Sequence, residues 1–164
     1  MAGRITKADD QLRPDPMFND LVLSRFINCI MHSGQKAPAQ RAVYGALELI
    51  QDKLKKETDP AAPKEAMDVF RRAIENCKPF VEVRSKRVGG ANYQVPIPVN
   101  RKRQQSLSFR WIIQAARSAK GRPMANRLAD EIYMAARNEG NAIQTKDQTH
   151  RMAEANKAFA HFAR

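Results

Sequence analysis

Two sets of side chains in this sequence could carry chemistry: a cysteine close to a histidine, and a dense group of arginines and lysines. Cys29 and His32 are the candidates for nucleophilic catalysis, which needs a base within hydrogen-bonding reach of the nucleophile. Their positions argue against it, because Cys29 falls on the apolar face of an expected helix and His32 falls at its end. The sequence also has no glycine-rich phosphate loop. We therefore predict no catalytic residue and a protein that is not an enzyme.

Metal and cofactor binding are equally unsupported by the residue pattern. Cys29 and Cys77 are the two cysteines, and neither has a second cysteine or a histidine at metal-ligand spacing. Both fall at apolar helical positions, which predicts buried free thiols in a reducing compartment. We expect no metal, no cofactor and no small-molecule substrate.

The basic residues are concentrated between Arg84 and Arg127. This window of 44 residues holds eleven basic side chains and no aspartate or glutamate, so it supplies +11 of the net charge of +12. Guanidinium groups bind phosphate through two parallel hydrogen bonds, and each neutralised phosphate releases counterions. The window therefore predicts a nucleic-acid-binding face. The alternative is a solvated charged surface, although such surfaces usually interleave acidic residues.

Within the window, two features point to particular contacts. Arg103, Arg110 and Arg117 recur every seven residues, which places a basic stripe on one side of a helix, opposite Leu107 and Trp111. We expect Trp111 to be part of the core. Tyr93 lies on an expected hairpin with little core to join, so stacking on RNA and packing within the protein both remain open for it.

Six segments have apolar residues at helical spacing. The first runs from about Asp20 to Met31, and the second lies beyond Pro38. The third follows the connector Asp59–Pro63 and begins at about Pro63, ending before Lys78-Pro79. The fourth runs from about Lys102 to Gly121, and the fifth has Pro123 as its first helical residue and ends before Gly140. The sixth begins with a capping box of Thr145 and Gln148 and continues through an apolar stripe of Met152, Ala155, Phe159 and Phe162.

Between the third and fourth segments the period changes to two. Val81 and Val83 alternate with polar residues, and the alternation resumes after Gly89-Gly90. This pattern predicts a β-hairpin over about residues 80–99, with Pro96 and Pro98 on an edge strand. The fold class is therefore mainly α: a six-helix bundle with a protruding two-stranded β-hairpin arm and a flexible N-terminal leader over residues 1–18.

Length and composition set the remaining limits. The 164 residues, 43% of them hydrophobic, suit a single RNA-binding domain spanning 1–164. No run of about 18 apolar residues occurs, and residues 1–20 mix acidic with basic side chains and lack a signal-peptide core, so we expect no membrane partner and a protein that stays where it is made. A helical DNA-binding regulator and a pure protein scaffold are the alternatives to RNA binding.

Two long motifs carry a more specific indication. Arg87-Val88-Gly89-Gly90 is followed by Tyr93-Gln94-Val95-Pro96, and residues 150–162 read HRMAEANKAFAHF. Together with LRPDP at 12–16 and RWI at 110–112, they resemble the universal small-subunit ribosomal protein S-seven family in its bacterial or organellar form. The resemblance covers nearly the whole chain.

The resemblance implies a primary ribosomal-RNA-binding protein of the small subunit. It would bind the 3′ major domain of the RNA, nucleate assembly of the head, lie near the exit-site tRNA and mRNA, and contact ribosomal proteins S-nine and S-eleven. The location implied is the ribosome in the cytoplasm or, for an organellar member, the ribosome of the organelle. The RNA contacts then fall on the leader, the loop after the first helix, the hairpin and the fourth helix: Arg13, Lys36, Arg84, Lys86, Arg87, Tyr93, Arg101, Lys102, Arg103, Arg110 and Arg117.

Overall fold

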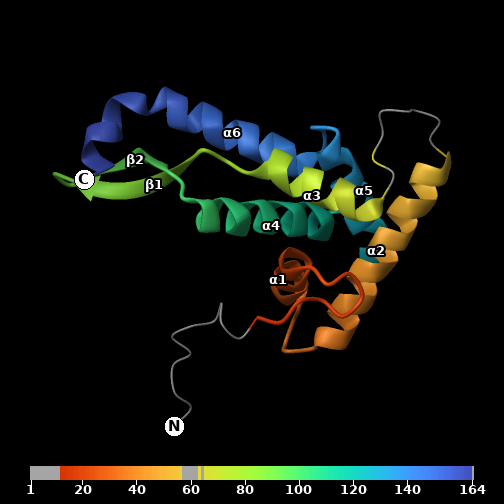
Figure 1. Cartoon of the computed structure of the whole chain (residues 1–164). Coiled ribbons are helices and arrows are strands. Elements are labelled where there is room, and N and C mark those ends of the chain that lie inside the picture. Colours follow the sequence, from red (N-terminus) through yellow and green to blue (C-terminus); the bar gives the residue numbers. More distant parts are fainter. Residues whose placement is uncertain (1–11, 57–62, 64, 164) are drawn as a thin grey trace, which may run out of the picture.

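The computed structural model describes residues 12–56, 63 and 65–163 (Figure 1). Residues 1–11 of the predicted leader and most of the predicted connector Asp59–Pro63 lie outside this part. The order of elements in it confirms a mainly helical fold with a two-stranded antiparallel hairpin. The elements are α1 (Leu21–Ile30), α2 (Lys36–Lys56), α3 (Ala66–Cys77), β1 (Val81–Val88), β2 (Ala91–Pro98), α4 (Arg101–Ser118), α5 (Met124–Ala136), α6 (Asn141–Ala155) and the 3₁₀ helix η1 (Lys157–Ala163).

Side-chain caps define where α1 and α4 begin. Asp20 accepts hydrogen bonds from the backbone N–H groups of Val22 and Leu23 at 2.7 and 2.9 Å, which satisfies donors that a helix start leaves unpaired. Asn100 does the same for α4 by accepting from Arg103 N at 2.9 Å. Both helices therefore begin within a residue or so of their predicted starts.

The other helix starts differ from the predictions. α2 begins at Lys36, so Pro38 lies inside its first turn, where a missing N–H costs no hydrogen bond. α3 begins at Ala66 rather than at about Pro63, and Pro123 is the N-cap of α5 rather than its first residue. These shifts do not change which side of each helix packs inward, because the apolar spacing and not the boundary determines that side.

The start of α6 departs furthest from the prediction. The helix begins at Asn141, so Thr145 is not a cap; its hydroxyl donates to Asn141 O within the helix at 2.8 Å. The cap comes instead from α5, where the buried carboxylate of Glu131 accepts from Ala142 N at 2.7 Å. Burial raises the pKa of Glu131, with hydrogen bonds from Ala142 and Asn141 opposing the shift. The predicted capping box is therefore wrong, because Glu131, which lies outside the helix, accepts the hydrogen bond at the start of α6.

Substitution of Gly140 by alanine is expected to destabilise the fold by about 1–3 kcal/mol. Gly140 has a φ of 91°, and an added Cβ would lie 3.0 Å from Glu131 Oε1 and 3.2 Å from Met134 Cβ, so the new methyl group would displace the cap of α6. Thermal or urea unfolding measures the loss. Gly121→Ala is the matched control, because Gly121 has a φ of 84° but open space around it; equal losses at the two sites would show that backbone strain alone matters.

A cluster of aromatic rings occupies the centre of the core. Phe26 of α1 packs edge-on against Phe70 of α3 and Phe109 of α4, with ring centroids 5.1 and 5.3 Å apart. Phe26 and Phe70 are fully buried. Trp111 is 8% exposed, which confirms its predicted place in the core. The helices that carry these rings are thereby fixed against one another.

The hairpin is paired along its whole length and turns at Gly89-Gly90, as predicted. It is better supported than a lone ribbon, because α6 and η1 run alongside it (Figure 1). Tyr93 of β2 contacts the rings of Phe159 and Phe162 in η1, with centroids 5.0 and 5.4 Å apart. A two-stranded hairpin alone is marginally stable in water, so these contacts stabilise the arm.

The apolar stripe predicted for the last helix is divided between two environments. Met152 is 46% exposed and Ala155 is also exposed, whereas Ala153 faces the core. The α-helix ends at Ala155, and the 3₁₀ turns that follow rotate Phe159 and Phe162 towards the hairpin. The stripe prediction is wrong for Met152 and Ala155, because it assumed one continuous helical period.

Candidate nucleic-acid interface

The basic residues predicted to bind RNA lie on the hairpin and along α4. Arg84, Lys86 and Arg87 are exposed on β1, the first strand of the hairpin. On α4 itself Arg101, Lys102, Arg110 and Arg117 are exposed, whereas Arg103 is half-buried. We call the exposed basic side chains of these two elements the basic surface.

A buried carboxylate joins the two elements. Glu82 of β1 is 7% exposed. Its Oε1 accepts from Arg84 Nε at 2.7 Å and its Oε2 accepts from Arg103 Nε at 3.0 Å. Burial alone would raise the pKa of Glu82, but the hydrogen bonds from Arg103 and Arg84 outweigh it and the pKa lies below the ordinary value. Glu82 therefore fixes the base of the hairpin to the start of α4.

Replacing Glu82 with glutamine is expected to lower the free energy of unfolding at neutral pH by about 1.5–3 kcal/mol, the contribution of hydrogen bonds to a charged group. Because the pKa of Glu82 is lowered in the folded protein, its stabilisation is present above the unfolded pKa and is lost as the pH falls through the folded value. The difference between Glu82→Gln and the original protein should therefore shrink in acid. Urea unfolding from pH 7 down to about pH 3 measures it; a difference that stays constant would contradict the ion-pair account.

Lys86 and Tyr93, two of the predicted contact residues on the hairpin, also have partners inside the protein. Lys86 Nζ donates to the carbonyl oxygen of Phe162 at 2.7 Å, and Tyr93 packs against η1 as described above. For Tyr93, the structure therefore shows packing within the protein. Stacking on RNA remains a prediction, since the ring is only half-buried.

The three arginines of the predicted stripe, Arg103, Arg110 and Arg117, have different surroundings. Arg103 pairs with Glu82, Arg110 is exposed, and Arg117 Nη2 donates to the backbone carbonyl of Ile30 at 3.0 Å. Ile30 is the last residue of α1, so Arg117 satisfies a carbonyl that the helix end leaves open. The stripe thus attaches α4 to its neighbours as well as presenting charge.

Farther along the window, Arg122 and Arg127 stabilise the fold through contacts within the protein. Arg122 pairs with Asp130 of α5 at 2.7 Å, and Lys53 of α2 pairs with the same carboxylate at 2.5 Å. Arg127 of α5 donates to the carbonyl of Ala119, the C-cap of α4. These side chains hold helices together, which is consistent with their absence from the predicted contacts.

Of the predicted residues outside the window, Arg13 and Lys36 are both exposed, Lys36 as the first residue of α2. The described part of the leader is fixed by Asp15, which is 3% exposed and accepts a hydrogen bond from Tyr44 Oη at 2.7 Å. Burial and the bond to Asp15 raise the pKa of Tyr44 to about 12. Arg13 therefore lies two residues from Asp15, whose hydrogen bond to Tyr44 anchors this part of the chain to α2.

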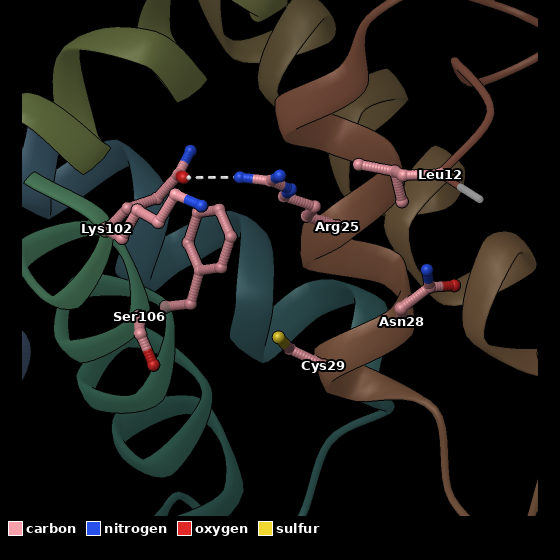
Figure 2. Close-up of a pocket in the computed structure, with 8 residues that line it drawn as sticks. Leu12, Arg25, Asn28, Cys29, Lys102 and Ser106 are labelled. Atoms are coloured by element: carbon pink, nitrogen blue, oxygen red, sulfur yellow. Dashed lines mark hydrogen bonds between the residues drawn. The ribbon is translucent and has the colours of Figure 1, made fainter. Parts of the chain in front are cut away.

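The structure also reveals a groove between α1 and α4 that the sequence pattern did not indicate. Its walls carry Arg25 and Cys29 from α1 and Lys102 from α4, and Figure 2 shows their side chains around it. Arg25 Nη1 donates to Gln105 Oε1 across the groove at 3.4 Å. Helical periodicity could have found Arg25, but nothing in the sequence indicates that α1 and α4 lie side by side.

Cys29 was predicted to be buried, and this is wrong. Its side chain is exposed in the groove, whereas Cys77 is buried as predicted. Partial burial raises the pKa of Cys29, with Arg110 and Arg25 opposing the shift, and burial raises the pKa of Cys77 to about 12. The apolar face of α1 is narrower than the spacing suggested, so Cys29 lies at its margin.

Other kinds of site find no support in residues 12–56, 63 and 65–163. None of the helices there is long and apolar enough to cross a membrane. No group of three or more histidine, cysteine or acidic residues in the same part of the chain could hold a metal ion.

Comparison with known proteins assigns the chain to a family. A sequence model of the family described as "Ribosomal protein S7p/S5e" matches residues 2–157. The chain is 54% identical over 161 residues to the "Small ribosomal subunit protein uS7" of Rhodopirellula baltica, covering 98% of this chain and 99% of that protein. It is 53% identical to the protein of the same name from Thermotoga neapolitana, covering 93% of each, and 46% identical to that of Methylobacterium radiotolerans, covering 99% of each. The chain therefore belongs to the ribosomal protein S7p/S5e family and is a structural component of the ribosome in the cytoplasm, not an enzyme.

Proposed function

We propose that the protein binds the 3′ major domain of the small-subunit ribosomal RNA directly and nucleates assembly of the head of the subunit. The observation that carries the proposal is the basic surface formed by the hairpin and α4. Its side chains are exposed, and Glu82 holds the two elements together before any RNA is present. A preformed surface loses less conformational freedom on binding than one that must be assembled.

The shape of this surface supports RNA as the partner. The hairpin extends from the helical body and ends in an exposed Gly89-Gly90 turn (Figure 1). Folded RNA is recognised largely through its shape and backbone at irregular junctions and loops, which an arm can enter. From the resemblance we further propose that the arm lies near the exit-site tRNA and mRNA, and that ribosomal proteins S-nine and S-eleven are neighbours.

The test is a binding titration with an RNA fragment of the 3′ major domain, compared with duplex DNA of equal length, over a range of salt concentrations. Specific binding predicts a steep salt dependence together with a preference for the RNA that persists at moderate salt. Equal and purely salt-limited binding to both would contradict the proposal. A preference for a palindromic duplex would instead support a DNA-binding regulator, and little salt-dependent affinity would support a protein scaffold.

A further inference from the structure

The groove between α1 and α4 consists of two hollows that meet. The first has a volume of ≈ 350 Å³ and the second of ≈ 300 Å³, and both are lined by Cys29 and Ser106. Together they follow α4 from Lys102 to Arg117. Hollows of about 300 Å³ or more are large enough for a small organic group.

The two hollows differ in the chemistry of their linings. The first is mainly apolar, with Phe109 and Leu12 among its lining residues and the amide side chains of Asn28 and Gln105 beside them. Phe109 is 3% exposed and its ring packs against the buried ring of Phe26, so this part of the lining is rigid. An apolar hollow with a few amide groups suits a flat heterocycle that has polar edges.

The second hollow is cationic. Arg110 and Arg117 are both among its lining residues, and Arg25 and Lys102 stand at the first hollow. No carboxylate is among the described residues that line either one. Two guanidinium groups without an acidic neighbour suit a phosphate, to which Arg110 and the N–H groups of Arg117 that do not bond to Ile30 O can donate.

We propose that this groove binds one unpaired nucleotide of an RNA strand. The base enters the first hollow beside Phe109, and the adjoining phosphate lies in the second hollow between Arg110 and Arg117. The inference rests on the proposed function, because it names the form of RNA that one part of the basic surface takes. A purely apolar peptide is the less suitable occupant, since it would bury the cations of the groove without a partner.

Cysteine labelling tests whether RNA occupies the groove. Cys29 is exposed in it and Cys77 is buried in the core, so a maleimide at about pH 8 should label Cys29 in the free protein and leave Cys77 as an internal control. Adding the RNA fragment of the 3′ major domain is expected to slow labelling of Cys29 by about tenfold or more, in proportion to complex formed.

A groove-filling variant tests insertion of the base. Ser106→Phe places a ring at the point where the two hollows meet, without removing a charge, and it should weaken binding of the RNA fragment by about tenfold, the order of effect of losing one base contact. The slope of log affinity against log salt should fall by about one unit at most, because only the phosphate of that one nucleotide can lose its contact. Gln148→Phe, on the exposed face of α6, is the matched control and should bind like the original protein. Cys29→Phe, on the opposite wall, replaces Ser106→Phe if the latter does not fold by circular dichroism.

The outcomes separate this inference from the proposed function. Protection of Cys29 together with weaker binding by the filled groove supports a bound nucleotide. If the original protein binds the RNA tightly while Cys29 reacts as in the free protein, the groove is empty in the complex; the inference fails and the proposed function stands. Protection with unchanged binding by the variants means that RNA crosses the groove without entering it, which also overturns the inference. Absence of RNA binding by the original protein refutes the proposed function itself.

Discussion

Replacing Arg84, Lys86 and Arg87 together with alanine is expected to weaken binding of the ribosomal RNA fragment by about 10- to 100-fold near physiological salt. Each side chain that neutralises a phosphate contributes about one unit to the slope of log affinity against log salt, so the slope should fall by about three. Because Arg84 pairs with Glu82 and Lys86 donates to Phe162, Arg87 should give the largest single effect of the three. Filter binding or fluorescence anisotropy across a salt series measures both quantities.

A matched control removes as much charge from another face. Lys55, Lys56 and Arg72 are exposed on α2 and α3, outside the basic surface, and their triple alanine variant should leave the slope nearly unchanged. If the two triple variants lose equal affinity, net charge rather than the hairpin surface governs binding. A hairpin variant with unchanged affinity would remove the arm from the interface.

Substitution of Phe26 by alanine is expected to cost about 3–5 kcal/mol of stability, the largest effect among the single changes considered. The ring is fully buried and packs edge-on against Phe70 and Phe109, so its removal leaves a cavity that rigid neighbours cannot fill. Chemical denaturation followed by circular dichroism measures the loss. RNA affinity should fall with it, because Phe109 loses a neighbour beneath the α1–α4 groove.

Phe80→Ala provides the comparison for this variant. Phe80 is 74% exposed and stacks on His150, so its loss should cost less than about 1 kcal/mol. Similar losses for Phe26 and Phe80 would mean that the aromatic cluster does not form the centre of the core.

The elements of the fold were predictable where local residues determine them. Asp20 and Asn100 cap their own helices, and Gly89-Gly90 makes its own turn, so these boundaries could be derived from neighbouring positions. The start of α6 could not, because its cap is Glu131 of α5, a residue that only the folded chain brings there. Sequence periodicity reports which side of a helix is apolar but not which distant carboxylate meets its end.

The candidate interface, like the fold, could be predicted from the sequence only in part. The exposure of Arg84 and Arg87 could be predicted from their charge, and the structure agrees. The groove depends on two helices meeting, one from each half of the chain, and the residues around Arg25 and Cys29 do not indicate that α1 and α4 lie side by side. Tyr93 shows the same limit, since its partner rings lie in η1 and a change from α to 3₁₀ geometry is needed to bring them there.

The packing of η1 on the hairpin also determines when the hairpin can complete its folding during synthesis of the chain. Phe159 and Phe162 are translated well after Tyr93, and at 5–20 residues per second the delay is roughly 3–13 s. During that interval the nascent hairpin lacks the rings that support it, while α1 to α3 have already been made. The arm therefore matures after the first helices, and its final shape becomes available to RNA only near the end of translation.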